Sequence, residues 1–161
     1  LDLITVRKLG APQNPEFAVG AIADGGTAIV DEARLKYLRV TKAQIDAILA
    51  REQQELDRRL ARFGTARPHL DVTGRTVIVV DDGLATGLTD LAALRAVRAM
   101  GAGRVILAVP VGSPRTVEEL QPLFDDIVCL DTPVTFWAIG QFYNDFAQTT
   151  DEEVVGLLRR N

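Results

Sequence analysis

Two adjacent acids followed by a run of small residues form the part of this sequence best suited to chemistry. Asp81 and Asp82 come directly after the apolar run 77–80. The residues that follow are small or carry a hydroxyl: Gly83, Ala85, Thr86, Gly87 and Thr89. Small residues let a backbone turn tightly and approach a ligand closely. If residues 77–80 form a strand of a parallel sheet, both acids lie at its carboxyl end, where such sheets bind ligands.

The same loop predicts a site for a phosphorylated sugar. A helix is expected over residues 89–100, and the N–H groups at a helix N-terminus bind anions such as phosphate. Two carboxylates beside a phosphate would repel it unless they face something else. Vicinal sugar hydroxyls fit, because each carboxylate can accept their hydrogen bonds. The loop is therefore expected to hold a ribose 5-phosphate.

The run Val-Ile-Val-Val-Asp-Asp-Gly-Leu-Ala-Thr-Gly-Leu-Thr at residues 77–89 resembles the phosphoribosyl pyrophosphate signature of type I phosphoribosyltransferases. The resemblance implies that Asp81 and Asp82 hold the ribose 2- and 3-hydroxyls, and they are the candidate catalytic residues. It also implies that residues 85–89 wrap the 5-phosphate. The candidate ligand-binding residues of the loop are Gly83, Leu84, Ala85, Thr86, Gly87, Leu88 and Thr89.

Three further segments, residues 6–10 with Pro12, residues 16–22 and residues 145–154, resemble a bacterial subgroup of uncharacterised phosphoribosyltransferase-like proteins. In the wider family, a loop after the second strand closes over the active site, and a C-terminal hood selects the base. By this resemblance Arg7 and Lys8 are candidates to meet the diphosphate, with a solvated pair at a loop edge as the alternative. The hood is expected at about residues 131–150. Its aromatic residues could stack on a planar acceptor or form the hood's own small core: Phe136, Trp137 and Tyr143.

The sequence departs from the family pattern in two places. Family members have a first strand and a diphosphate-binding loop upstream of the position where this chain starts, at Leu1. We therefore expect either a truncated chain or a protein that lacks half of the diphosphate site. Leu88 and Asp90 are also unusual for the family. Asp90 falls in the first turn of the expected helix, where it could cap the helix, although its charge near a phosphate is a mild cost.

The pattern of apolar residues predicts the elements that position this loop. Short strands are expected at residues 2–6, 18–23 and 27–30, the last two as a β-hairpin, with a loop over residues 7–17. Helices are expected at 31–38 and from Thr41, whose pairing with Gln44 is typical of a capping box, to Phe63. The charged face of the longer helix, which includes Glu52, is expected to be solvated or to form an oligomer contact.

From residue 74 onward, apolar strands alternate with amphipathic helices. Strands are expected at 75–80, 104–109 and 127–130, helices at 89–100 and 114–120, and a terminal helix at 151–160. This alternation predicts a single α/β domain over residues 1–161, with a twisted parallel sheet covered by helices on both faces, a β-hairpin insertion and the small hood.

Composition excludes several classes of protein. The formal net charge is −4 and the basic residues are dispersed, which argues against nucleic-acid binding. A single cysteine and a single histidine, Cys129 and His69, argue against disulfides, a catalytic triad and a zinc site. No apolar run approaches the roughly 18 residues of a membrane span. A cytoplasmic protein without a membrane partner is expected, with a homodimer as an open alternative to a monomer.

The expected reaction displaces diphosphate from C1 of phosphoribosyl pyrophosphate by a nitrogen nucleophile on an acceptor, most simply a base, that the sequence does not identify. Mg²⁺ is the expected cofactor, bound mainly through substrate oxygens, and no protein metal ligand or general base is identified. The alternative is a non-catalytic module that senses the activated sugar or a nucleotide. A receiver domain is disfavoured, because the strand at 104–109 ends in Pro110-Val111-Gly112 without an acceptor Asp. A dinucleotide-binding domain is also disfavoured, because no Gly-x-Gly-x-x-Gly motif follows any of the expected strands.

Overall fold

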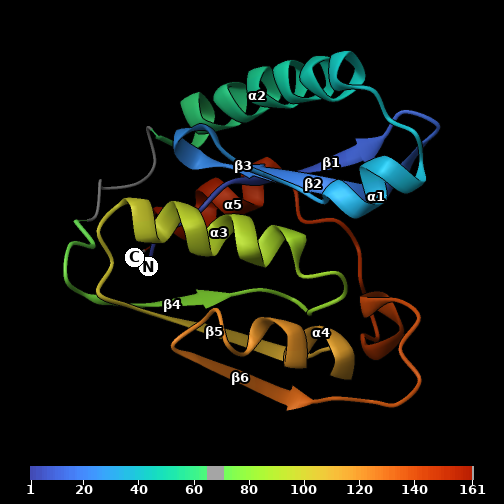
Figure 1. Ribbon diagram of the computed structural model, residues 1–161. Coiled ribbons are helices and arrows are strands. Elements are labelled where there is room, and N and C mark those ends of the chain that lie inside the picture. Colours follow the sequence, from blue (N-terminus) through green and yellow to red (C-terminus); the bar gives the residue numbers. More distant parts are fainter. Residues whose placement is uncertain (65–70, 161) are drawn as a thin grey trace.

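The computed structural model describes residues 1–64 and 71–160, so the expected linker with His69 lies outside the described residues. The elements stack in layers (Figure 1). Helix α2 (Lys42–Gly64) covers a three-stranded antiparallel sheet, helix α3 (Leu88–Ala99) lies beneath that sheet, and a three-stranded parallel sheet follows. Helix α3 therefore packs between the two sheets and joins their cores.

The antiparallel sheet has the order β1-β2-β3, with β1 (Val6–Ala11), β2 (Asn14–Ala23) and β3 (Thr27–Val30). The predicted hairpin of residues 18–23 and 27–30 is confirmed, and the 3₁₀ helix η1 (Asp24–Gly26) forms its turn. The predicted strand at 2–6 and loop at 7–17 are wrong, since β1 pairs with β2 and Ala11 faces Asn14 across a tight turn. The breakers that suggested a loop lie in that turn and at a register shift around Gly10, where a hairpin needs them.

Two helices follow and close one face of this sheet. Helix α1 (Glu32–Tyr37) is capped by Asp31, whose carboxylate accepts a hydrogen bond from the Arg34 backbone N–H at 2.9 Å. Helix α2 begins with the predicted capping box: the Thr41 N–H donates to Gln44 Oε1 at 2.9 Å, and the Gln44 N–H donates to Thr41 Oγ1 at 3.3 Å. The resulting core contains residues from strands and helices alike: Leu9, Val19, Ile22, Leu35, Ile45, Ile48 and Leu56.

Helix α3 packs against the other face of the antiparallel sheet through small side chains. Ala92 and Ala96 of α3 contact Ala21, Ala23 and Ile29 in a buried cluster. Small residues on both sides let helix and sheet approach closely, which fixes where the N-terminus of α3 lies.

The parallel sheet has the order β4-β5-β6, with β4 (Thr76–Val80), β5 (Arg104–Val111) and β6 (Asp126–Asp131). Helix α3 connects β4 to β5, and helix α4 (Pro114–Leu120) connects β5 to β6. The α/β class, the parallel pairing and the predicted alternation of strands and helices are thereby confirmed. The core on the α3 side of this sheet combines strand residues with residues of α3 and α4: Val79, Leu84, Leu94, Val97, Leu107, Val109 and Leu120.

The two faces of the parallel sheet are not covered alike. Alternate residues of β4 and β6 point away from the core, and Ile78, Val80 and Leu130 have exposed fractions of 60%, 75% and 79%. Among residues 1–64 and 71–160, helices pack on the face of Val79 and Leu107, and this second face stays open. Helices are expected from the sequence on both faces of the parallel sheet, and within the described residues they cover one of the two.

The C-terminal part is irregular, as predicted for the hood at about residues 131–150. Its one short helical turn is the 3₁₀ helix η2 (Ile139–Phe142). Helix α5 (Asp151–Leu158) follows, with a capping box between Thr150 and Glu153, and Arg62 of α2 forms ion pairs with Asp151 and Glu152. None of the helices in the described ranges is long and apolar enough to cross a membrane.

Candidate functional site

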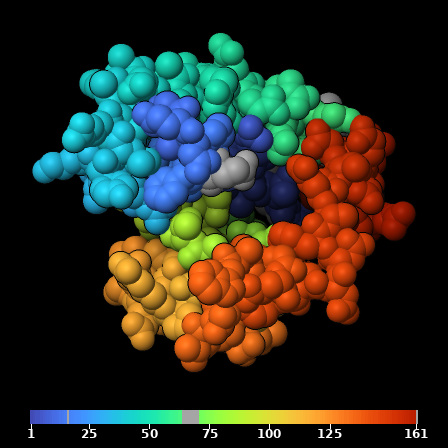
Figure 2. Space-filling view, turned by 90° about the vertical axis from the view of Figure 1, so that its right-hand side faces the viewer, coloured from blue at the N-terminus to red at the C-terminus, as the bar shows by residue number. Residues whose placement is uncertain are grey.

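The candidate site is the loop that joins β4 to α3, at the carboxyl end of the parallel sheet. The Asp81 backbone N–H donates to the Ala108 carbonyl at 3.3 Å, so the first acid still belongs to the end of the strand. Further along, Leu84 forms a parallel bridge with Gly112. Figure 2 shows a hollow in this face of the molecule, with the yellow-green chain that follows β4 on its floor between the blue strands and the orange hood.

Gly87 makes the turn from the loop into α3. Its φ of 70° lies in the left-handed region, and it occupies the N-cap position without a side-chain hydrogen bond to the first turn. A Cβ at this position would lie 2.7 Å from Leu120 Cδ1 and 3.0 Å from Thr116 Cγ2. The backbone conformation therefore favours glycine, and any larger residue would also have to displace the side chains of Leu120 and Thr116. No side chain caps the first turn of α3, which suits this helix end to an anion.

Residues of β5, α4 and the turn between them hold the loop in place by hydrogen bonds. The Thr116 hydroxyl, which the sequence did not single out, donates to the Ala85 carbonyl at 2.7 Å. Leu84 is fully buried, its N–H donates to the Val111 carbonyl at 2.9 Å, and its carbonyl accepts from the Ser113 N–H at 2.8 Å. The prediction that Leu84 contacts the ligand is corrected accordingly, because its side chain and both backbone groups already have partners.

The other loop residues differ in how far a ligand could reach them. Ala85 and Thr86 are exposed, Leu88 and Thr89 are half-buried, and Gly83 and Gly87 are buried. A Cβ at Gly83 would lie 2.8 Å from Ile139 Cγ2, so the hood packs directly on the loop at that point. The open part of the loop is thus the stretch around Thr86, between the two acids and the start of α3.

Three carboxyl groups gather beside this stretch. Asp82 is exposed, Asp81 is half-buried, and Asp90 in the first turn of α3 is only 3% exposed. The Asp82 N–H donates to Asp81 Oδ1 at 2.9 Å, and the Asp90 carboxyl lies close enough to that of Asp81 for the two to interact. Within the described ranges, no arginine or lysine forms an ion pair with any of the three.

The surroundings raise the pKa of all three acids. Burial raises the pKa of Asp81 despite its hydrogen bonds, and burial together with the charge of Asp81 raises the pKa of Asp82. Burial and then the Asp81 charge raise the pKa of Asp90 to about 7. A group of hydrogen-bond acceptors with no neighbouring cation is suited to donors such as sugar hydroxyls.

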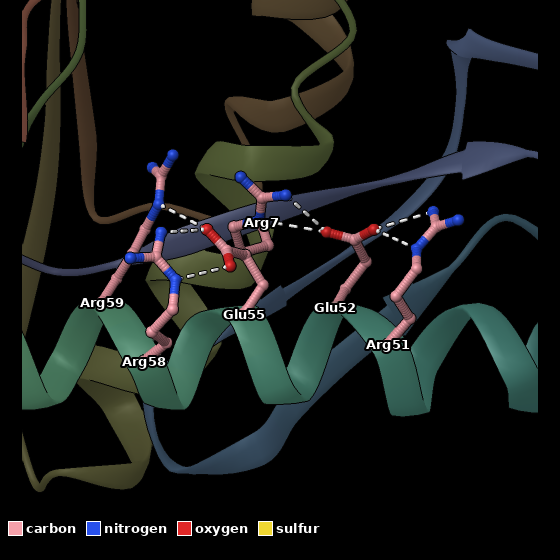
Figure 3. A network of polar contacts seen from close by, with 6 residues as sticks. All are labelled: Arg7, Arg51, Glu52, Glu55, Arg58 and Arg59. Atoms are coloured by element: carbon pink, nitrogen blue, oxygen red, sulfur yellow. Dashed lines mark hydrogen bonds and ion pairs between the residues drawn. The ribbon is translucent and has the colours of Figure 1, made fainter.

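Arg7 has a partner that the sequence did not reveal. Its Nε and Nη2 donate to Glu52 Oε2 at 3.0 and 2.7 Å, while Arg51 Nε donates to Glu52 Oε1 at 2.9 Å (Figure 3). Glu52 is 6% exposed, so the expectation of a solvated face is wrong at this position. Burial acts to raise the pKa of Glu52, but the hydrogen bonds from Arg7 and Arg51 outweigh it and leave that pKa lowered.

This ion pair changes the assignment of the two basic candidates. The Arg7 guanidinium ties β1 to α2, so its geometry supports a structural role instead of the predicted diphosphate contact. Lys8 alternates with Arg7 along β1 and is exposed. A diphosphate contact stays a prediction for Lys8.

Among the three predicted hood aromatics, Tyr143 contacts the loop directly. The Tyr143 hydroxyl donates to the Asp82 carbonyl at 2.6 Å, and its ring lies 5.0 Å from that of Phe146. Phe136 pairs with Phe142 at 5.4 Å between ring centroids. Trp137 is 86% exposed. Phe136 and Tyr143 thus form ring pairs within the hood, whereas the Trp137 ring is open to a ligand.

The chain is similar to known proteins along most of its length. Residues 3–147 match the family described as phosphoribosyl transferase domain. A Mycobacterium tuberculosis protein named "Putative phosphoribosyl transferase Rv0571c" is 43% identical over 160 residues. These residues are 99% of this chain but 36% of that protein. "Bifunctional protein PyrR" of Chloroflexus aurantiacus is 33% identical over 134 residues, which are 83% of this chain and 66% of that protein.

A solved structure shows the same fold. The crystal structure of TT1426 from Thermus thermophilus aligns with a TM-score of 0.77 and 41% sequence identity, covering 99% of this chain and 75% of that one. The similarity therefore includes the loop after β4, the hood and both sheets.

Proposed function

This chain belongs to the phosphoribosyl transferase domain family, and from that premise we propose that it binds phosphoribosyl pyrophosphate and transfers the ribose 5-phosphate to a nitrogenous acceptor, with release of diphosphate. The observation that carries the proposal is the arrangement at the loop after β4. Asp81 and Asp82 have no cationic partner in the described residues, and they lie beside the uncapped first turn of α3. A sugar with vicinal hydroxyls and a phosphate supplies hydrogen-bond donors to the first group and an anion to the second.

The chain's own residues would act mainly by binding and by electrostatics. Exposed Thr86 and the backbone of residues 85–89 bind the 5-phosphate, while Asp81 and Asp82 accept hydrogen bonds from the ribose hydroxyls. A nitrogen of the acceptor then attacks C1 as the bond from C1 to diphosphate breaks, and the proton displaced from that nitrogen passes to water. Positive charge develops on the sugar in this step, and the two carboxylates stabilise it. The exposed Trp137 ring offers a planar surface for a base.

Mg²⁺ enters the proposal only with the substrate. Within residues 1–64 and 71–160, no cluster of three or more His, Cys, Asp or Glu side chains is arranged to hold a metal ion. Any Mg²⁺ that arrives with the substrate would be held mainly by diphosphate and ribose oxygens. Mg²⁺ with phosphates usually has few protein ligands and several waters.

The alternative is a module that binds the activated sugar without turnover. It is supported by the ion pair that occupies Arg7, because this removes one of the two candidate contacts to diphosphate. The chain spans 36% of the length of the Mycobacterium relative. Any activity of a longer protein that contains this domain is therefore part of the proposal as well. A homodimer and a cytoplasmic location stay predictions.

Calorimetry with phosphoribosyl pyrophosphate and MgCl₂, followed by an assay of diphosphate release with a panel of purine, pyrimidine and nicotinic-type bases, tests the proposal. We expect micromolar to millimolar binding and release of diphosphate with at least one base. Asp81→Asn with Asp82→Asn removes the charge of the site. Asp46→Asn on the outer surface of α2 is its matched control, since Asp46 pairs with Lys42 in solvent. Binding without diphosphate release would favour the module, and absence of binding would exclude both.

A further inference from the structure

Asp90 is the most deeply buried acid of the site, and phosphate binding gives it no role. Its side chain is 3% exposed, and Oδ1 is buried with no hydrogen-bond donor among the described residues. Oδ2 lies 3.5 Å from the Thr89 hydroxyl, at the limit of a hydrogen bond. An ionised carboxylate in this position would be strongly destabilising, because a buried charge needs a cation or several donors.

The neighbour of Asp90 is another carboxyl group, that of Asp81. Two carboxylates are both acceptors, so a hydrogen bond between them requires a proton on one of them. Asp81 is more exposed, and its Oδ1 already accepts the Asp82 N–H at 2.9 Å. Both observations favour the charge on Asp81 and the proton on Asp90.

We propose that Asp90 is a positioning residue, which donates a hydrogen bond to the Asp81 carboxylate and thereby holds Asp81 in the orientation that accepts the ribose hydroxyls. The ligand in this statement rests on the proposed function of the loop. The hydrogen bond between Asp90 and Asp81 does not depend on it.

The surroundings of α3 support this assignment. The helix packs against β1, β2, β3, η1, β4 and β5, and in the described residues Asp81 is the charged side chain that acts on Asp90. Among the other charged groups of those elements, Arg7 binds Glu52, Asp24 accepts the Thr5 N–H, Arg104 pairs with Asp126, and Lys8 is exposed. Burial and Asp81 raise the pKa of Asp90 to about 7. Asp90 is accordingly a donor in weakly acid solution and loses this capacity as the pH rises above neutrality.

The first arm of the test measures binding of ribose 5-phosphate by calorimetry to the wild type, Asp90→Asn and Asp90→Leu between pH 6 and 8.5. The asparagine amide donates to Asp81 at every pH, whereas leucine fills similar space without a donor. We expect Asp90→Leu to bind about tenfold more weakly than Asp90→Asn throughout, as the loss of one hydrogen bond to a charged group implies. The wild type is expected to match Asp90→Asn near pH 6 and to fall below it above pH 7. Affinities are compared between variants at each pH, because the ligand phosphate also titrates.

The second arm follows the carboxyl carbons by NMR without ligand. Asp81 is expected to ionise at a lower pH in Asp90→Asn than in Asp90→Leu, since a donated hydrogen bond stabilises its charged form. Equal ionisation of Asp81 in the two variants, with ligand binding intact, would overturn the role of Asp90 and leave the proposed function standing. A difference at Asp81 with no ribose 5-phosphate binding in any form would overturn the proposed function instead. Should Asp90→Leu fail to fold, the wild type and Asp90→Asn decide alone, since the role is overturned if their relative affinity is the same at every pH.

Discussion

Glu52 and Asp90 are two acids buried to almost the same extent, 6% and 3% exposed, in very different company. Glu52 on α2 receives hydrogen bonds from Arg7 and Arg51 and is charged. Asp90 on α3 faces Asp81 and has no cation beside it in the described residues. The first arrangement is complete without a ligand and connects two elements. The second contains no cation among those residues and leaves acceptor oxygens of Asp81 and Asp82 to hydrogen-bond donors from outside, as the proposed binding site requires.

Charge removal at each place should separate these roles. The largest effect is expected for Asp81→Asn with Asp82→Asn, which replaces both candidate acceptors of the ribose hydroxyls. Loss of two hydrogen bonds to charged groups should weaken phosphoribosyl pyrophosphate binding by about 100-fold or more. Calorimetry measures this loss, and urea unfolding is expected to show a fold at least as stable as the wild type. An unchanged affinity would exclude the two acids from the site.

The converse variant, Glu52→Gln, should leave ligand binding intact and destabilise the fold. It keeps the shape of the side chain but leaves Arg7, whose side chain is 28% exposed, without its carboxylate. Breaking a buried ion pair costs several kcal/mol, and partial exposure of Arg7 lowers our expectation to about 2 kcal/mol. Urea unfolding at pH 7 measures the change. Glu55→Gln on the same helix is the control and should have a clearly smaller effect, and equal effects would contradict the structural role of Glu52.

The two acids should also respond to pH in opposite directions. The pKa of Glu52 is lowered in the folded chain, so its contribution to stability is present above its ordinary pKa and is lost as the pH falls through the lowered value. The pKa of Asp90 is raised from 3.8 to about 7, so its folded environment loses stability as the pH rises over that interval. Asp90→Asn should therefore gain stability relative to the wild type between pH 4 and 7, by at least about 1.4 kcal/mol, the equivalent of one pKa unit. Urea unfolding over this range checks it, and a constant difference would show that Asp90 does not titrate there.

The smallest effect is expected at the neutral hydrogen bond that holds the loop after β4. Thr116→Val removes the hydroxyl that donates to the Ala85 carbonyl at 2.7 Å and keeps the side-chain shape. We expect a loss of about 1 kcal/mol in the free energy of unfolding and a few-fold weaker binding of ribose 5-phosphate. Thr132→Val, at an exposed position after β6, is the control. Equal affinities of the two variants for ribose 5-phosphate would mean that this hydrogen bond does not shape the loop after β4.

The sequence predicted the parts of the molecule that depend on local patterns. Apolar periodicity located α2, α3 and the three parallel strands, and the pairing of Thr41 with Gln44 located the start of α2. The acid pair and the glycine-containing loop were recognised because turn chemistry and strand ends have local signatures. The hairpin of β1 and β2 was missed, since Gly10 and Pro12 suggest a loop when the partner strand is unknown.

Partners distant in sequence could not be predicted. Nothing near Arg7 indicates Glu52, and nothing near Asp82 indicates the Tyr143 hydroxyl, because both contacts arise from the way the layers stack. One local signal in the sequence does bear on the site, namely the acid at position 90. An acid in the first turn of α3, next to a site for a phosphate, is unfavourable as a charge, and burial in the folded chain explains how Asp90 is accommodated.

The layered arrangement also has a consequence for the order in which the chain gains its structure. The core under α2 is formed by side chains from Leu9 to Leu56, all within the first part of the chain, and its hairpins connect neighbours in sequence. Such local contacts form quickly, whereas the parallel pairs β4–β5 and β5–β6 close longer loops and form more slowly. During synthesis the antiparallel sheet and α2 can fold before β5 leaves the ribosome. We therefore expect helix α3 to dock on an already folded surface and the loop that begins at Asp81 to form after it.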